Sequence, residues 1–145
     1  MKLIPVLLLT VLAAAGAPAT PGLEEIRKEA DGRKRFDLAI GLAENQALAA
    51  RQLVRDSGSR TDLEKMLADV TGGCDLALES LRSLGVKPSK LGKQYKKGEV
   101  KSRDIERLLG DIALALSIDD RPLAEKARDQ VAVIHEEFLL GVMDK

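Results

Sequence analysis

The sequence predicts an all-α protein in which two long antiparallel helical hairpins pack as a four-helix bundle or layer and are joined by a basic linker. Apolar residues recur at alternating spacings of four and three in successive segments, a pattern typical of a helix that packs against a partner helix. Glycine, proline, serine, threonine and aspartate stand between these segments, where they end one helix and begin the next. We therefore expect a single α-helical domain over residues 20–145.

Residues 1–19 have the features of a cleaved secretory signal peptide. Lys2 precedes an apolar run over residues 3–15, and small residues follow. The run is shorter than the roughly 20 residues that cross a bilayer as a helix, so no transmembrane span is expected after cleavage. Cleavage after Ala19 fits best, because cleavage after Ala17 would leave Pro18 beside the cut bond. The protein is expected to be exported from a bacterial cell, to the periplasm or the medium.

The first predicted hairpin covers residues 23–84, and its first helix covers residues 23–57. The seam of this helix is mostly alanine, so a partner helix is expected to approach it closely. Gly32 and Gly41 lower the helix propensity, and the part before Phe36 is therefore expected to fray or to kink separately. The seam residues are Phe36, Ile40, Ala43, Ala47, Ala50 and Val54.

The second helix of this hairpin follows a short turn at Gly58. Thr61 and Glu64 have the spacing of a capping box, which predicts the start of the helix. Cys74, the only cysteine, lies on the predicted seam, so it is expected to be buried. Gly72 and Gly73 do not break the apolar register and therefore favour a kink or a close helix contact. The seam residues are Leu63, Leu67, Val70, Cys74, Ala77, Leu81 and Leu84.

The basic linker is predicted over residues 85–101. Gly85 is suited to a left-handed helix cap, and Pro88 blocks continuation of the helix. Leu91 and Tyr95 stand four residues apart and could hold a short helix against the bundle, with the lysines pointing outward. Glu99 is the one acid of residues 87–103, against seven basic residues. These are Lys87, Lys90, Lys93, Lys96, Lys97, Lys101 and Arg103.

The second predicted hairpin covers residues 102–143, with Ser102 as the N-cap of its first helix. The seam of that helix is Ile105, Leu109, Ile112 and Leu116. A turn follows, in which Asp120 is expected to cap the last helix and Pro122 to occupy its first turn. The seam of the last helix is Ala124, Ala127, Val131, Ile134, Phe138 and Gly141.

The paired-helix plan resembles that of tetratricopeptide-type proteins, although these helices are longer than that repeat allows and its Trp/Leu-Gly/Tyr pattern is missing. The stretch Ser117–Lys145 is also similar to the tails of uncharacterised exported bacterial helical proteins. That resemblance covers about a fifth of the chain and implies no activity.

Several chemistries are disfavoured by the residues present. The 23 basic and 23 acidic residues balance, and one Tyr, two Phe and no Trp leave little to stack on nucleic-acid bases. His135 is the only histidine, and Leu139 stands where a zinc-protease helix would need a second one. We predict no catalytic, cofactor-binding or metal-binding residues. The alternative is a four-helix protein that carries haem or another cofactor on His135.

The sequence thus predicts a non-enzymatic interaction or scaffold protein of the bacterial envelope. The seven basic residues from Lys87 to Arg103 are the candidate site for an anionic surface or an acidic protein partner, unless they only keep a linker solvated. The apolar end of the last helix, around residues 138–142, is a second candidate surface.

Overall fold

A computed structural model describes residues 21–145, and the predicted signal peptide lies outside these residues. The elements in this part of the chain are helices, with no strand among them. They are α2 (Leu23–Arg27), α3 (Gly32–Arg55), α4 (Arg60–Arg82), the 3-10 helix η1 (Pro88–Leu91), α5 (Gly92–Ala115) and α6 (Arg121–Met143). The all-α helical-bundle prediction is confirmed.

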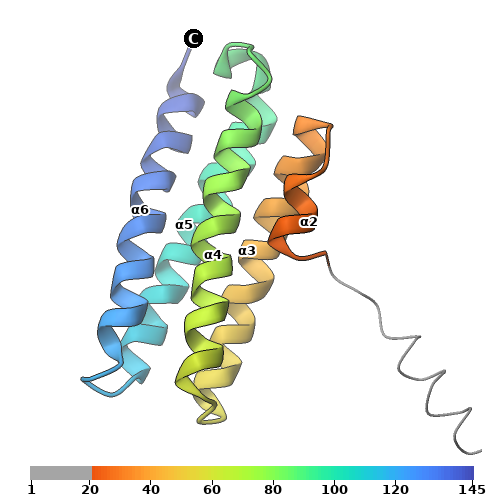
Figure 1. Cartoon of the computed structure of the whole chain (residues 1–145). Coiled ribbons are helices and arrows are strands. Elements are labelled where there is room, and N and C mark those ends of the chain that lie inside the picture. Colours follow the sequence, from red (N-terminus) through yellow and green to blue (C-terminus); the bar gives the residue numbers. More distant parts are fainter. Residues whose placement is uncertain (1–20) are drawn as a thin grey trace, which may run out of the picture.

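The four long helices form two antiparallel hairpins that pack side by side (Figure 1). Helices α3 and α4 make one hairpin and α5 and α6 make the other. Across the junction α3 packs beside α5 and α4 beside α6, and each of these pairs runs parallel. Helices α4 and α5 follow each other in the chain but barely touch, so η1 and its flanking turn carry the chain diagonally over one end of the bundle.

The predicted helix over residues 23–57 is not continuous, because the chain breaks between α2 and α3, so the separate kink expected before Phe36 is present. Asp31 caps α3 by accepting hydrogen bonds from the backbone N–H groups of Arg33 and Lys34. Arg35 fixes the break, since its guanidinium donates to the Glu29 carbonyl at 2.6 Å and to the Ser80 hydroxyl of α4 at 2.8 Å. The short helix α2 then lays its Ile26 side chain, 1% exposed, against the core.

The capping box predicted at Thr61 and Glu64 is wrong, because a different residue caps α4. Helix α4 begins at Arg60, and Ser59 caps it by accepting a hydrogen bond from the Asp62 backbone N–H at 3.1 Å. Thr61 therefore lies inside the first helical turn, where it cannot be the N-cap. The left-handed residue of this turn is Ser57, with φ of 55°. At the other end of α4, Gly85 is left-handed with φ of 68°, as expected.

The basic linker predicted over residues 85–101 is also wrong, because α5 begins at Gly92 and includes most of it. Ser102 is not an N-cap: it lies within α5, fully buried, and its hydroxyl donates to the Gly98 carbonyl at 2.6 Å. Asp120 occupies the N-cap position of α6 without a capping hydrogen bond, and its carboxylate instead pairs with Arg60 at 3.0 Å. Pro122 lies in the first turn of α6, as predicted.

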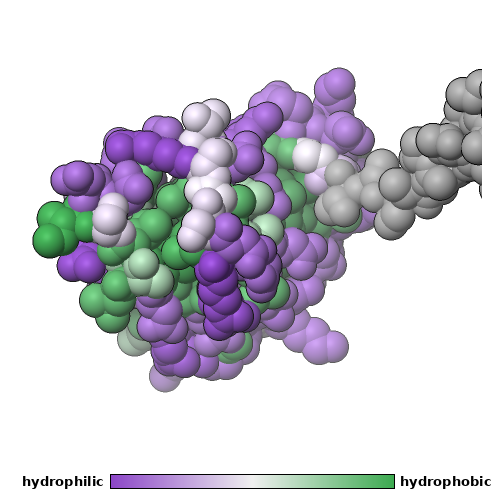
Figure 2. Space-filling view, turned by 90° about the horizontal axis from the view of Figure 1, so that it is seen from below, coloured by the Kyte–Doolittle hydropathy of each residue, from purple (hydrophilic) through white to green (hydrophobic). Residues whose placement is uncertain are grey.

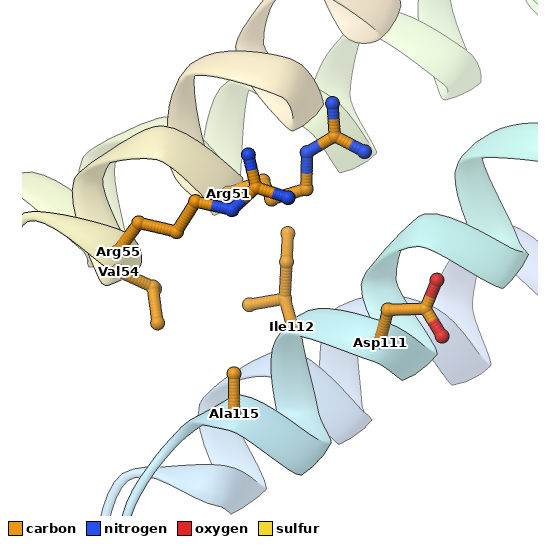
Figure 3. Close-up of a pocket in the computed structure, with 6 residues that line it drawn as sticks. All are labelled: Arg51, Val54, Arg55, Asp111, Ile112 and Ala115. Atoms are coloured by element: carbon orange, nitrogen blue, oxygen red, sulfur yellow. The ribbon is translucent and has the colours of Figure 1, made fainter.

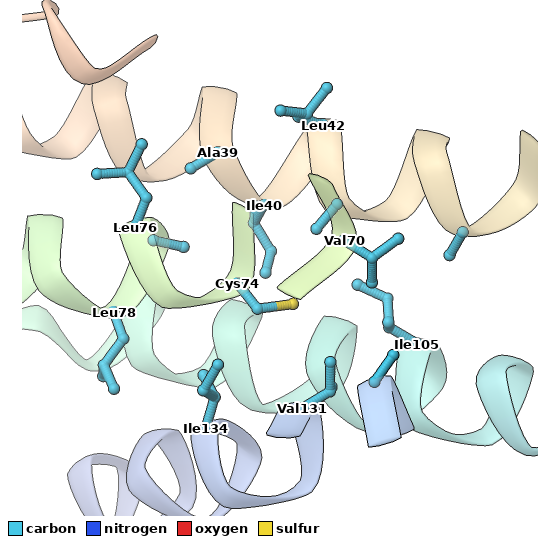
Figure 4. Packing of buried hydrophobic residues seen from close by; sticks show 14 of the residues in the cluster. Ala39, Ile40, Leu42, Val70, Cys74, Leu76, Leu78, Ile105, Val131 and Ile134 are labelled. Atoms are coloured by element: carbon cyan, nitrogen blue, oxygen red, sulfur yellow. The ribbon is translucent and has the colours of Figure 1, made fainter. Parts of the chain in front are cut away.

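The predicted seams supply most of the core. Cys74 is fully buried and points from α4 toward the middle of the bundle (Figure 4). At the η1 end of the bundle Phe138 is the centre of an aromatic cluster, with edge contacts to Phe36 and Tyr95 at centroid distances of 6.1 and 6.2 Å. Val54, Leu84 and Leu116 of the seams are only partly buried, because each lies near the end of its helix.

Helices α3 and α4 approach each other closely at Gly73. A Cβ atom on Gly73 would lie 2.9 Å from the Ala39 carbonyl oxygen and 3.1 Å from the Ala43 Cβ. Gly72 makes similar room for the Leu23 side chain of α2. The close helix contact expected at this glycine pair is therefore present.

The substitution Gly73→Ala is expected to lower the free energy of unfolding by about 1–2 kcal/mol, because overpacking against a backbone carbonyl outweighs the gain in helix propensity. Gly41→Ala is the matched control. A Cβ there meets nothing within 4 Å, so stability should rise by up to about 1 kcal/mol. Urea denaturation followed by far-UV circular dichroism measures both, and equal effects of the two changes would contradict the close approach.

Candidate functional site

The seven predicted basic residues lie along η1 and the first half of α5 rather than on a flexible linker. Lys87 precedes η1, and Lys90 lies within it. The other five follow one another along three turns of α5. The helical turn therefore sends these side chains in different directions, which divides them into two groups.

Four of the seven basic residues are used within the fold. Lys97 pairs with Asp37 of α3 at 3.0 Å, and Lys101 pairs with Glu44 of α3 at 2.9 Å. The remaining two, Lys96 and Arg103, pair with Glu99 on their own helix at 3.1 and 3.4 Å. These pairs are partly exposed, so each contributes little free energy. The pairs of Lys97 and Lys101 match α5 to two acids of α3, whereas those of Lys96 and Arg103 stay within α5.

The other three basic residues gather where the chain crosses the end of the bundle. Lys87, Lys90 and Lys93 are exposed, and none makes an ion pair with any residue that the structure describes. The C-terminal end of α6 packs beside them, because the Ser89 backbone N–H donates to the Asp144 carboxylate at 3.2 Å. Figure 1 shows η1 and the C-terminus at this same end.

Exposed apolar side chains accompany these three lysines. Val86 stands next to Lys87 and is 43% exposed, while Leu140 and Met143 at the end of α6 are 61% and 64% exposed. Phe138 and Gly141 of the same helix face the core, so only part of the apolar surface predicted around residues 138–142 is exposed to an external partner. We call this surface the η1 face. It consists of Val86, Lys87, Lys90, Lys93, Leu140 and Met143.

Glu99, which is buried, and His135, which is partly buried, form a polar pair that the sequence did not reveal. Glu99 is 3% exposed, and its Oε2 atom lies 3.1 Å from Nε2 of His135 on α6. A carboxylate can only accept, so Nε2 carries the proton and donates it. The second ring nitrogen, Nδ1, lies 3.9 Å from Glu106. Only Glu99 is within hydrogen-bond distance of the ring, and the Nε2 atom, which a haem iron would need, already donates to it.

The hydrogen bond from His135 is the largest cause that lowers the pKa of Glu99 below its ordinary value of 4.5. Burial acts in the opposite direction, and the hydrogen bond from Lys96 and the charge of Arg103 add to the lowering. A carboxyl group whose pKa is lower in the folded state stabilises the fold above its unfolded pKa. That stabilisation is lost as the pH falls through the folded pKa.

The remaining groups that could react or bind a metal ion in the described part of the chain are buried or lie apart from one another. Burial, with a smaller contribution from the charge of Asp75, raises the pKa of the Cys74 thiol to about 12, so the thiol stays protonated and unreactive at neutral pH.

Among residues 21–145, His, Cys, Asp and Glu side chains do not come together in a group of three that could hold a metal ion. An open depression of about 510 Å³ lies beside His135, and its charges largely balance. Its charged lining residues are Arg103, Glu106, Arg107, Arg128 and Glu136.

No protein-family model, curated protein or solved structure matches this chain. Within the part of the chain that the structure describes, no helix is both long enough and apolar enough to cross a membrane.

Glu99→Gln is expected to lower the free energy of unfolding at neutral pH by about 2 kcal/mol, because the hydrogen bond from His135 loses its charged acceptor. The wild type should lose stability as the pH falls below about 4.5, and the variant should lose less over the same interval. Urea denaturation at a series of pH values measures both effects. Glu106→Gln is the control, because that carboxyl is more exposed. A variant with the same pH dependence as the wild type would show that Glu99 does not contribute.

Proposed function

We propose that the protein is a non-enzymatic, exported interaction protein of the bacterial envelope that docks on anionic lipid headgroups through the η1 face. The observation that carries this proposal is the set of three lysines without acidic partners among the described residues, at the same end of the bundle as exposed apolar side chains of α6. Lys96, Lys97, Lys101 and Arg103 are left out of the docking surface, because each is paired within the fold.

The chemistry of the η1 face suits a lipid surface better than an acidic protein. Each lysine near an anionic membrane contributes about 1 kcal/mol, so three lysines alone attach a protein weakly and reversibly. Side chains such as Leu140 and Met143 can add apolar contact with the boundary between headgroups and acyl chains. Lysines near exposed apolar groups match both layers of a membrane surface, the charged headgroups and the apolar boundary beneath them.

The triple variant Lys87→Gln/Lys90→Gln/Lys93→Gln is expected to bind vesicles containing phosphatidylglycerol on the order of 100-fold more weakly than the wild type at low salt, because about 1 kcal/mol is lost for each lysine. Vesicle co-sedimentation measures the partition coefficient. The matched control is Lys28→Gln/Lys65→Gln/Lys126→Gln, which removes three other exposed lysines. The control should bind like the wild type.

Two further measurements separate the contribution of charge to vesicle binding from that of apolar contact. Moderate salt should weaken wild-type binding, because it screens exposed charges. Leu140→Ser/Met143→Ser should reduce the binding that remains in salt. Equal binding to vesicles of phosphatidylcholine alone, or equal losses in the triple variant and its control, would overturn the proposal.

A further inference from the structure

A groove lies between the last turns of α3 and the end of α5 (Figure 3), at the end of the bundle opposite η1. It encloses about 360 Å³, which is within the range of small-molecule sites. Val54 of α3 and Ile112 and Ala115 of α5 point into it and form an apolar floor (Figure 3). Asp111 of α5 lines the groove on its Arg51 side, away from Val54 and Ala115 (Figure 3).

Two arginines of α3 border this floor. Arg51 and Arg55 are one helical turn apart, and Figure 3 shows both extending along the α3 side of the groove. Neither guanidinium makes a hydrogen bond or ion pair with a residue in the described range 21–145. Like charges at this spacing repel each other. An anion held by both would remove that repulsion and form charge-assisted hydrogen bonds.

The apolar floor continues beyond the arginines toward the two helix turns. A second depression, of about 240 Å³, shares Val54 and Ala115 with the first and adds Leu53, Leu63 and Leu116. Arg60 and Asp120 lie at its edge and pair with each other. Leu114 and Ile118 are 75% and 79% exposed in the same region of the chain. Figure 2 shows that hydrophobic residues reach the surface at this end, among hydrophilic ones.

We infer that this groove binds an amphiphile with one anionic head and one acyl chain, such as a medium-chain fatty acid. The carboxylate would lie between Arg51 and Arg55, and the chain would follow Val54, Ile112 and Ala115 toward Leu53 and Leu116. A volume of about 360 Å³ fits one acyl chain rather than two. Charge complementarity selects the anionic head, and the apolar floor selects a ligand with a tail.

Isothermal titration calorimetry with decanoate, below its micelle concentration, tests the charged part of the site. The wild type is expected to bind decanoate saturably. Arg51→Gln/Arg55→Gln should weaken this binding by roughly tenfold or more, because two charge-assisted hydrogen bonds are lost. Lys28→Gln/Arg33→Gln removes two exposed positive charges near the start of α3 and should bind like the wild type.

Ala115→Trp tests the apolar part without changing the charge. Ala115 is exposed at the last turn of α5 and lines both depressions, so an indole there should fill the path of the acyl chain and abolish decanoate binding. The melting temperature, measured by circular dichroism, should stay close to that of the wild type.

Two other ligands test whether binding requires both the anionic head and the acyl chain. Decanol, which lacks the charge, and inorganic phosphate, which lacks the chain, should both bind much more weakly than decanoate. Phosphate binding as tight as decanoate binding would show an anion site without an acyl path and would overturn the inference. The absence of saturable decanoate binding, or unchanged binding by the double arginine variant, would overturn it as well.

Discussion

The close approach of α3 and α4 at Gly73 is the constraint on which the rest of the bundle depends. The seam of α3 is mostly alanine, and at Gly73 the backbone of α4 lies almost against the carbonyl of Ala39. Two helices this close leave little space between them, and the apolar side chains of α5 and α6 complete the core from the other side. Because the interior is filled by side chains, the features that can bind a ligand lie in surface grooves and at the ends of the helices.

Ion pairs help to position α5 against the other helices of the bundle. Its basic residues meet acids on α3, and Glu99 gathers Lys96, Arg103 and His135 at the junction of α5 and α6. Within the described part of the chain, every buried side-chain nitrogen and oxygen has a hydrogen-bond partner. The charges that remain without partners on η1 and on α3 are therefore confined to the surface, where they are free to meet an external group.

Much of the fold was predictable because apolar spacing determines which face of a helix is buried. The seam assigned Cys74 and Phe138 to the core correctly, since burial needs only the register of one helix. The residues that pair across helices were not predictable: Lys97 and Asp37 are 60 residues apart, and Glu99 and His135 are 36 apart. Sequence alone therefore named seven basic residues, and only the packing shows which of them are already paired. The start of α5 was missed because glycine at positions 92 and 98 weakens the helical pattern, although Gly98 is needed to admit the Phe138 ring.

Helix α5 runs the whole length of the bundle and carries Lys93 near one end and Ile112 near the other. At about 1.5 Å per residue, these positions are roughly 30 Å apart along a rigid rod. If both proposals hold, a molecule that rests on a bilayer by its η1 face holds the groove about 30 Å above the membrane surface. That height exceeds the reach of a lipid acyl chain, which spans one hydrocarbon leaflet of roughly 15 Å. An acyl chain could not lie in the groove and remain inserted in the same membrane, so loading would require complete extraction of the lipid and a passage through water.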